Sequence, residues 1–214
     1  MTKEAKIISG VGVLFFALFA LLIYKTNTSS QAVADPNLLI GQVSYMTGTK
    51  DAKVNVVEFG DYQCPACAYA SPIVQQLVDA YKDNPNVNFV FRNFPLPQHS
   101  NAMISAEAAE AARAQGKFLE MSEMLYGRQS EWSGSSKALE IFTGYAKELG
   151  LDIKAFTDSV NQKKFQETII KDRSDGQALG VNSTPSFFIN GEKLNGIPSF
   201  DEFKKIIDEK LYTN

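Results

Sequence analysis

Cys64 and Cys67 are the only cysteines of the 214-residue chain, and they stand in the order Cys-Pro-Ala-Cys. A run of apolar residues at 54–59 precedes them and predicts a strand, and apolar periodicity at 65–82 predicts a helix behind them. Cys64 therefore lies at a helix N-terminus, where unpaired backbone N–H groups and the helix dipole favour an anion. Such a position lowers the pKa of a thiol toward its reactive thiolate form. The pattern predicts a redox-active dithiol, with Cys64 as nucleophile and the more buried Cys67 as the resolving thiol.

Three other uses of a cysteine pair fit the sequence less well. A structural zinc site needs four ligands, and His99 is the only histidine available to add to the pair. Haem attachment needs a histidine directly after the second cysteine, where this chain has Ala68. A purely structural disulfide closing so short a loop restricts the unfolded chain little. We therefore expect catalytic redox chemistry that needs neither a metal nor a cofactor.

The N-terminal part predicts a membrane anchor. Residues 7–24 contain no charge and are just long enough to span a bilayer as a helix. Lys3 and Lys6 precede this stretch, so the positive-inside rule places residues 1–6 in the cytoplasm and the remainder of the chain outside it.

A cleaved signal peptide is the alternative reading, because Ala32-Val33-Ala34 resembles a cleavage site. Both readings export the rest of the chain to the periplasm or the cell surface. We expect residues 25–53 to form a linker and an extended lead-in, followed by one domain at 54–214.

Composition limits the partners of that domain. The chain has a formal net charge of −3 and no run of basic residues, which argues against nucleic acid as a partner. No dimerisation module is recognisable in the sequence, so we expect a monomer that meets the membrane only through its N-terminal anchor.

The remaining pattern places strands at both ends of the domain and helices between them. Residues 87–93 alternate as a second strand, parallel to the first if a right-handed crossover joins them. Asn190-Gly191 between 186–189 and 192–194 predicts a hairpin with a two-residue turn. Helices are predicted at 100–115 with Ser100 as N-cap, and at 118–128, 136–149, 152–161, 164–179 and 200–211.

Four stretches in this order resemble a known family. They are residues 58–67 around the cysteines, 91–96 together with His99, 183–191 around Thr184-Pro185, and Asn195-Gly196. With the helical segment between them, they resemble the DsbA-like thiol:disulfide oxidoreductases, particularly their membrane-anchored branch. The resemblance implies an α/β thioredoxin fold, a central mixed sheet flanked by helices, with a helical subdomain inserted at about 99–180.

The resemblance also implies roles for residues away from the cysteines. Thr184-Pro185 matches a cis-proline loop that positions substrate, although an ordinary proline at a strand entry would look the same. Glu58 matches a buried acid that exchanges a proton with Cys67, and its alternative is an acid at the solvated end of the strand. His99 matches a family histidine, but at a helix start it could simply satisfy local hydrogen bonds.

The residues around the pair are expected to shape the active-site rim. These are Pro65, Ala66, Asp61, Tyr62 and His99, and the charge of Asp61 would oppose a thiolate at Cys64. DsbA itself has histidine at the position of Ala66, and an imidazolium there would favour the thiolate. The alanine therefore predicts a milder oxidant.

These features predict an extracytoplasmic thiol:disulfide oxidoreductase that oxidises cysteine pairs in exported proteins. Reduced exported proteins would be its substrates, and a quinone-linked re-oxidase in the membrane would be its redox partner. A reductase or isomerase of the same fold is the first alternative, and a chaperone-like binding module with idle cysteines is the second.

Overall fold

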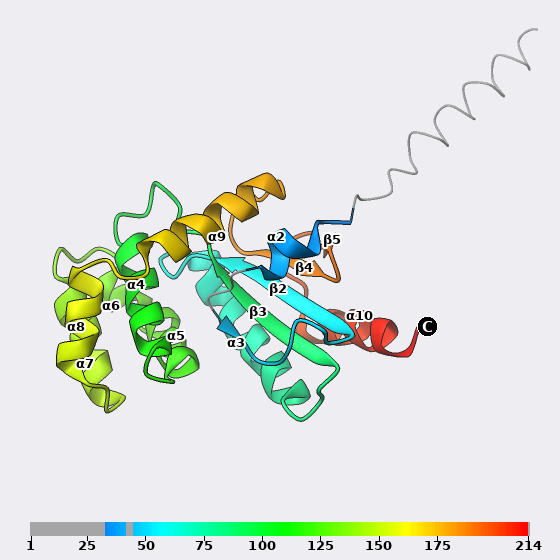
Figure 1. Cartoon of the computed structure of the whole chain (residues 1–214), viewed down its shortest axis with the longest axis horizontal. Coiled ribbons are helices and arrows are strands. Elements are labelled where there is room, and N and C mark those ends of the chain that lie inside the picture. The colour runs from blue at the N-terminus through cyan, green and yellow to red at the C-terminus, as the bar shows by residue number, and fades with distance from the viewer. Residues whose placement is uncertain (1–32, 42–44, 214) are drawn as a thin grey trace, which may run out of the picture. The chain divides into compact units, whose positions relative to one another are not determined.

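A mixed five-stranded sheet forms the centre of the protein in a computed structural model that describes residues 33–41 and 45–213 (Figure 1). The strand order is β1 (Tyr45–Met46), β3 (Val87–Asn93), β2 (Val54–Gly60), β4 (Ser186–Ile189) and β5 (Glu192–Lys193). β2 and β3 are parallel and are joined through α3 (Pro65–Tyr81), whereas the other pairs are antiparallel. This arrangement confirms the predicted βαβ unit and the C-terminal hairpin.

The two faces of the sheet bury different cores, because successive side chains of a strand point to opposite faces. Val54 and Val56 pack with α3 and with α10 (Phe200–Tyr212). Val57 and Phe59 pack on the other face, which α2 (Pro36–Ile40) and α9 (Gln166–Ala178) cover (Figure 1). Glu58 follows Val54 and Val56 at alternate positions of β2, so its side chain points to the same face of the sheet, the one that α3 covers.

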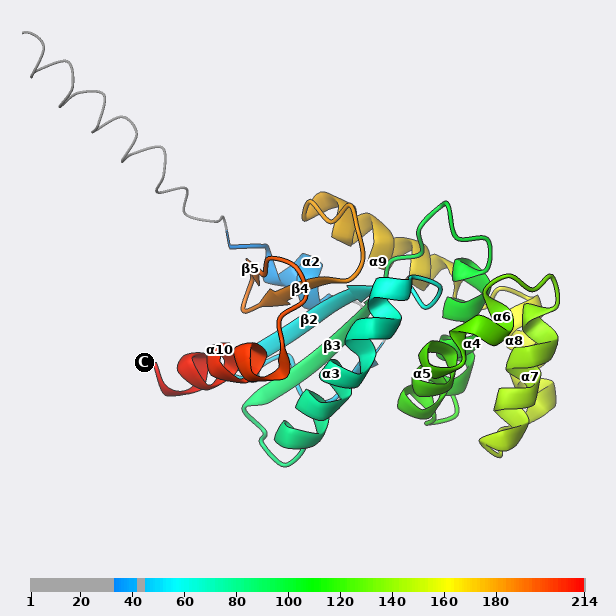
Figure 2. The same cartoon turned by 180° about the vertical axis from the view of Figure 1, so that it is seen from behind.

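A helical subdomain lies beside the sheet, as predicted for the segment between the second and third long strands (Figure 2). Its core contains the buried aromatic side chains of Trp132, Phe142 and Phe156. Its helices are α4 (Ala102–Arg113), α5 (Phe118–Gly127), α6 (Gln129–Trp132), α7 (Ala138–Glu148) and α8 (Ile153–Asn161). The chain then returns to the sheet through α9.

Two local predictions require correction. The lead-in at 37–53 is not simply extended, because it contains helix α2 and strand β1, which pairs with β3. Asp35 caps α2 by accepting a hydrogen bond from the Asn37 backbone N–H, a signal that the sequence reading overlooked. Ser100 does not cap α4; Asn101 occupies the N-cap position without a side-chain cap.

The predicted turn between β4 and β5 is confirmed. Asn190 and Gly191 have φ values of 49° and 86°, and a two-residue hairpin turn with both φ values positive favours this Asn-Gly pair.

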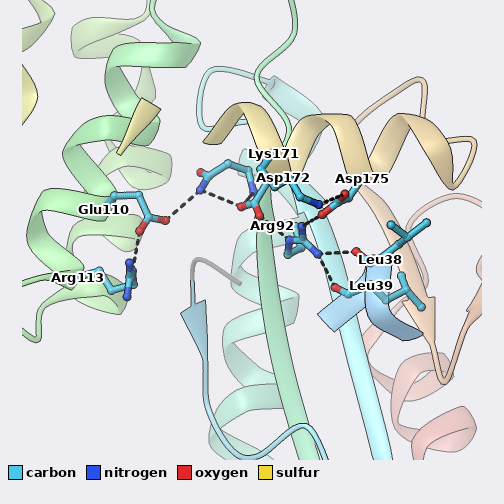
Figure 3. A network of polar contacts seen from close by, with 9 residues as sticks. Leu38, Leu39, Arg92, Glu110, Arg113, Lys171, Asp172 and Asp175 are labelled. Carbon is cyan, nitrogen blue, oxygen red and sulfur yellow. Dashed lines mark hydrogen bonds and ion pairs between the residues drawn. The ribbon is translucent and has the colours of Figure 1, made fainter. Parts of the chain in front are cut away.

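A buried ion-pair network holds the helices of the second face to the sheet (Figure 3). Arg92 on β3 is fully buried, and its guanidinium contacts Asp172 at 2.7 Å and Asp175 at 2.8 Å on α9. It also donates hydrogen bonds to the backbone carbonyls of Leu38 and Leu39 in α2. A single side chain of β3 therefore fixes both α9 and α2.

The predicted membrane anchor at residues 7–24 lies outside the described residues, as do residues 1–6 before it. Within 33–41 and 45–213, none of the helices combines the length and the apolar character needed to cross a bilayer.

Candidate active site

The end of β2 and the start of α3 position the two cysteines. Cys64 is the N-cap residue of α3, with extended backbone angles, and Pro65 follows at the first helical position, where no backbone N–H is needed. The turn before it is closed by a hydrogen bond from the Cys64 backbone N–H to the Asp61 carbonyl at 3.0 Å. Cys67 is one turn further along α3 and is fully buried. The two cysteines are not joined by a disulfide in this structure.

The two thiols have opposite electrostatic environments. A hydrogen bond from the Cys67 thiol lowers the pKa of Cys64 to about 5, although partial burial opposes the shift, and Thr184 and the backbone N–H groups of Cys67 and Ala66 lower it further. Burial raises the pKa of Cys67 well above its ordinary value, and the neighbouring Cys64 and Glu58 raise it further. These opposite shifts favour the thiolate at Cys64 and the thiol at Cys67 at neutral pH.

The loop before β4 brings Thr184 and Pro185 to the cysteines. The peptide bond between them is cis, and the Sγ atom of Cys64 lies 3.4 Å from the Thr184 carbonyl oxygen. The antiparallel pairing of β2 with β4 sets this contact, because Phe59 is opposite Ser186. Residues 120 positions apart in the chain thus meet at the reactive sulfur.

Glu58 is buried near enough to both cysteines to interact with them electrostatically, and it does not lie at a solvated end of β2. Its side chain is 7% exposed, and its Oε1 atom has no hydrogen-bond partner among the described residues. Burial, and secondarily the charge of Cys64, raise the pKa of Glu58 to about 8. A carboxyl group with this pKa can hold or release a proton near neutral pH, which is what proton exchange with Cys67 requires.

Asp61 and His99 are paired with each other. Asp61 is buried, and its Oδ2 atom is 2.7 Å from Nδ1 of His99 and accepts a hydrogen bond from the Leu96 backbone N–H. Its Oδ1 atom accepts a hydrogen bond from the Gln63 backbone N–H at 2.8 Å. The prediction of Asp61 at the exposed rim needs correction, because its buried carboxyl group organises the loop. His99 is paired with this residue from 38 positions further along the chain.

Tyr62 is likewise not a rim residue. It is 1% exposed, its ring packs against Phe91 and Tyr126, and its hydroxyl group is 2.9 Å from the hydroxyl of Ser122. Its aromatic ring fits the interface between the sheet and the helical subdomain, whereas Pro65 is exposed and Ala66 is half-buried beside the cysteines. The exposed part of the rim is therefore smaller than the sequence predicts.

Amide side chains fix the cysteine loop to the helical subdomain, and the sequence reading missed Gln129 among them. The side-chain amide of Gln129 donates hydrogen bonds to the carbonyl oxygens of Tyr62 at 2.8 Å and Cys64 at 3.1 Å. Gln63 donates to the Ser133 carbonyl and accepts from the backbone N–H of Asn101. No local pattern marks these residues, because each contact joins segments at least 38 positions apart.

Comparison with protein families gives one match over most of the chain. The family model described as thioredoxin matches residues 42–209, which include the cysteines and the Thr184-Pro185 loop.

Solved structures show the same arrangement of elements. A thioredoxin-like oxidoreductase from Silicibacter pomeroyi is 30% identical, with a TM-score of 0.68 over 85% of this chain and 100% of that chain. Oxidised BdbD from Bacillus subtilis is 24% identical, with a TM-score of 0.71 over 81% of this chain and 95% of its own. The thiol-disulfide exchange protein α-DsbA2 from Wolbachia pipientis is 22% identical, with a TM-score of 0.68 over 81% and 90%. At 24% and 22% identity, the last two structures show only that the fold is shared.

Curated relatives are much longer than this chain. A Na⁺/H⁺ antiporter, NhaA 1, of Salinispora arenicola is 36% identical over 153 residues, which are 71% of this chain and 22% of that protein. The NhaA antiporter of Herminiimonas arsenicoxydans is 30% identical over 87% of this chain and 30% of its own length. The chain thus spans less than a third of these relatives, and the antiport in their names is not transferred to it.

Proposed function

This chain belongs to the thioredoxin family, and from that premise we propose that it is an extracytoplasmic oxidase that introduces disulfides into exported proteins. It is a thiol–disulfide oxidoreductase with a DsbA-like arrangement, in which a helical subdomain is inserted into the thioredoxin fold. The observation that carries the oxidising direction is the asymmetry of the two cysteines. The low pKa of Cys64, about 5, stabilises the dithiol form as a thiolate, and stabilising the reduced form makes the disulfide a stronger oxidant.

The reaction begins with the Cys64–Cys67 disulfide. A substrate thiolate attacks the sulfur of Cys64, a new S–S bond forms to the substrate, and Cys67 leaves with the electron pair of the broken bond. Because Cys67 is buried and its thiol pKa is high, the departing sulfur takes up a proton. Glu58 supplies that proton in this proposal, since burial is the larger cause of its raised pKa and still favours the protonated carboxyl group when the cysteine pair is a disulfide.

The second step releases the oxidised substrate. A second substrate thiolate attacks the substrate sulfur of the mixed disulfide, and Cys64 leaves as a thiolate. A thiol of low pKa is the better leaving group, so this step also favours transfer of the disulfide to the substrate. Two electrons have then moved from the substrate to the cysteine pair, which is left reduced. A membrane partner that carries a disulfide and is linked to quinone would accept these electrons and re-oxidise the pair.

Thr184 and Pro185 position the substrate. The Thr184 carbonyl lies 3.4 Å from the Cys64 sulfur, so an extended substrate strand pairing with this loop would place its cysteine beside the reactive atom. Reduced exported proteins are the proposed substrates, and residues 7–24 would anchor a monomer with its catalytic domain outside the cytoplasm. A periplasmic thioredoxin-like protein from Salmonella enterica serovar Typhimurium, 22% identical with a TM-score of 0.64, has the same fold, which is compatible with that location.

Oxidation of a peptide with two cysteines by the oxidised full-length chain tests the function. We expect one disulfide formed per protein in a single turnover, no reaction with Cys64→Ser, and a persistent mixed disulfide with Cys67→Ala and an activated substrate. Retention of oxidase activity by Cys64→Ser would refute the assigned nucleophile. Rapid reduction of disulfide substrates, with no net oxidation in glutathione buffers, would instead identify a reductase.

A further inference from the structure

A glutamine of the helical subdomain binds the backbone of the residue whose sulfur reacts. Gln129 is the first residue of α6, and its side-chain nitrogen lies 2.8 Å from the carbonyl oxygen of Tyr62 and 3.1 Å from that of Cys64. A primary amide has two N–H groups, so each carbonyl receives one of them. The full donor capacity of this side chain is therefore directed at the cysteine loop.

The short helix that carries Gln129 is held by the core of the subdomain. α6 ends at Trp132, whose ring is fully buried and packs edge-on against Phe142. The indole N–H of Trp132 donates a hydrogen bond to the carbonyl of Leu125, near the end of α5, at 2.9 Å. The subdomain core thus sets the position of the Gln129 amide, independently of the cysteine loop.

A second glutamine joins the same two segments in the opposite direction. Gln63, in the cysteine loop, donates a hydrogen bond from its side-chain amide to the Ser133 carbonyl at 2.7 Å. Its side-chain oxygen accepts a hydrogen bond from the Asn101 backbone N–H at 2.6 Å. The loop and the turn after α6 are therefore linked from both sides, which holds Gln129 at a fixed distance from Cys64.

The carbonyl groups that Gln129 binds lie close to the reactive sulfur. One belongs to Cys64 itself and the other lies two residues before it. Negative charge beside a thiol disfavours its thiolate, and the N–H dipoles of the amide offset the partial negative charge of these oxygens. The ionisable groups that interact with Cys64 are Cys67 on α3 and Glu58 on β2, and replacing an uncharged glutamine alters neither of them.

We propose that Gln129 is a positioning residue through which the helical subdomain makes the cysteine pair more oxidising. It acts through the two carbonyl groups and not on the sulfur itself. The thiolate that it favours exists only in the reduced pair, so the contact stabilises the dithiol form more than the disulfide. Stabilising the reduced form makes the disulfide a stronger oxidant. The inference rests on the proposed function and adds a residue that adjusts it.

The redox equilibrium of the full-length chain with glutathione tests the role of Gln129. Gln129→Met keeps the length of the side chain and removes both donors, and Gln177→Met, at an exposed position of α9, is the matched control. We expect the equilibrium constant for oxidation of glutathione to fall about threefold to tenfold in Gln129→Met, the range that one hydrogen bond supplies, and tenfold corresponds to about 30 mV. Gln177→Met should equal the wild type.

The ionisation of Cys64 separates hydrogen bonding from charge. The acid dissociation constant of its thiol should fall about threefold to tenfold in Gln129→Met. Gln129→Lys should restore it at least to the wild-type value, because an ammonium group donates to both carbonyls. Ser130→Lys, at an exposed position of α6, adds the same charge without these hydrogen bonds and should leave most of the loss in place when combined with Gln129→Met. Full recovery by Ser130→Lys would overturn the role of the hydrogen bonds.

Unfolding in guanidinium separates this role from a merely structural one. Gln129→Met should destabilise the reduced protein more than the oxidised protein. The ratio of the two changes in unfolding constant should equal the change in the glutathione equilibrium, because the measurements close one thermodynamic cycle. Equal losses in both redox states, with a wild-type glutathione equilibrium, would overturn the proposal and leave Gln129 a structural residue.

Failure of this inference differs in its result from failure of the proposed function. A wild-type equilibrium in Gln129→Met overturns the inference alone, because the wild-type pair would still oxidise its substrates. A wild-type pair as reducing as thioredoxin overturns the oxidase, and the change caused by Gln129→Met then still decides whether the subdomain adjusts the pair.

Discussion

Replacing Glu58 with glutamine should change how the stability of the reduced protein depends on pH. Burial and the Cys64 charge raise the pKa of Glu58 from 4.5 to about 8. A group with a raised pKa takes up a proton on folding, so its contribution to stability is complete below pH 4.5 and is lost as the pH rises to about 8. Glutamine cannot ionise, so Glu58→Gln should escape this loss.

The size of the effect follows from the pKa shift. Each pH unit between the two pKa values corresponds to about 1.36 kcal/mol, so the loss at pH 7 has an upper limit of about 3 kcal/mol. Relative to wild type, Glu58→Gln should gain about 1–3 kcal/mol of unfolding free energy between pH 4 and pH 7. The gain should be smaller in the oxidised protein, where the Cys64 thiolate no longer raises the pKa of Glu58.

Guanidinium unfolding of the reduced full-length chain at several pH values measures this difference. Glu167→Gln is the control, because Glu167 is an exposed side chain of α9 and its replacement should leave the pH profile close to that of the wild type. A stability difference between Glu58→Gln and wild type that stays constant from pH 4 to pH 8 would refute the reasoning, since it would mean that folding does not change the ionisation of Glu58.

Three further outcomes follow from the structure. The rate of Cys64 alkylation should rise with pH with a midpoint near pH 5. The midpoint should be higher in Cys67→Ala, because the hydrogen bond from the Cys67 thiol makes the largest contribution to the low pKa of Cys64. An unchanged midpoint would contradict this cause. Arg92→Met should cost about 3–5 kcal/mol in chemical unfolding, because it removes the guanidinium that pairs with two buried carboxylates, yet it should not move the alkylation midpoint. A loss under 1 kcal/mol would contradict the importance of the network. Gln129→Leu removes two hydrogen bonds to the cysteine loop and should cost about 1–2 kcal/mol in the same assay, whereas a neutral result would mean that the loop holds its shape without them.

The sequence predicts the parts of the fold that local patterns encode. The strand at 54–59, the helix behind Cys64 and the Asn190-Gly191 turn all agree with the structure, because periodicity and turn chemistry act over a few residues. The meeting of Cys64 with Thr184 could also be predicted, but only through the family resemblance, since the two residues are 120 positions apart.

What the sequence does not reveal depends on tertiary contacts. Helix α2 is five residues long, and Arg92 binds two of its carbonyl groups from β3, so its stability comes from outside its own sequence. The burial of Asp61 could not be read locally, because two of the three contacts of its carboxyl group are with the backbone of Leu96 and the ring of His99, 35 and 38 positions away. Gln129 was missed for the same reason, since a glutamine on a short helix carries no signal of its distant partner.

The equilibrium reduction potential of the full-length chain in glutathione buffers tests the central claim most directly. The stabilised Cys64 thiolate predicts an oxidising pair, and Ala66 in place of histidine predicts a milder oxidant than DsbA. We therefore expect a value between about −200 and −120 mV, the latter being that of DsbA. A value near −270 mV, that of thioredoxin, would contradict the proposal that this chain gives disulfides to its substrates.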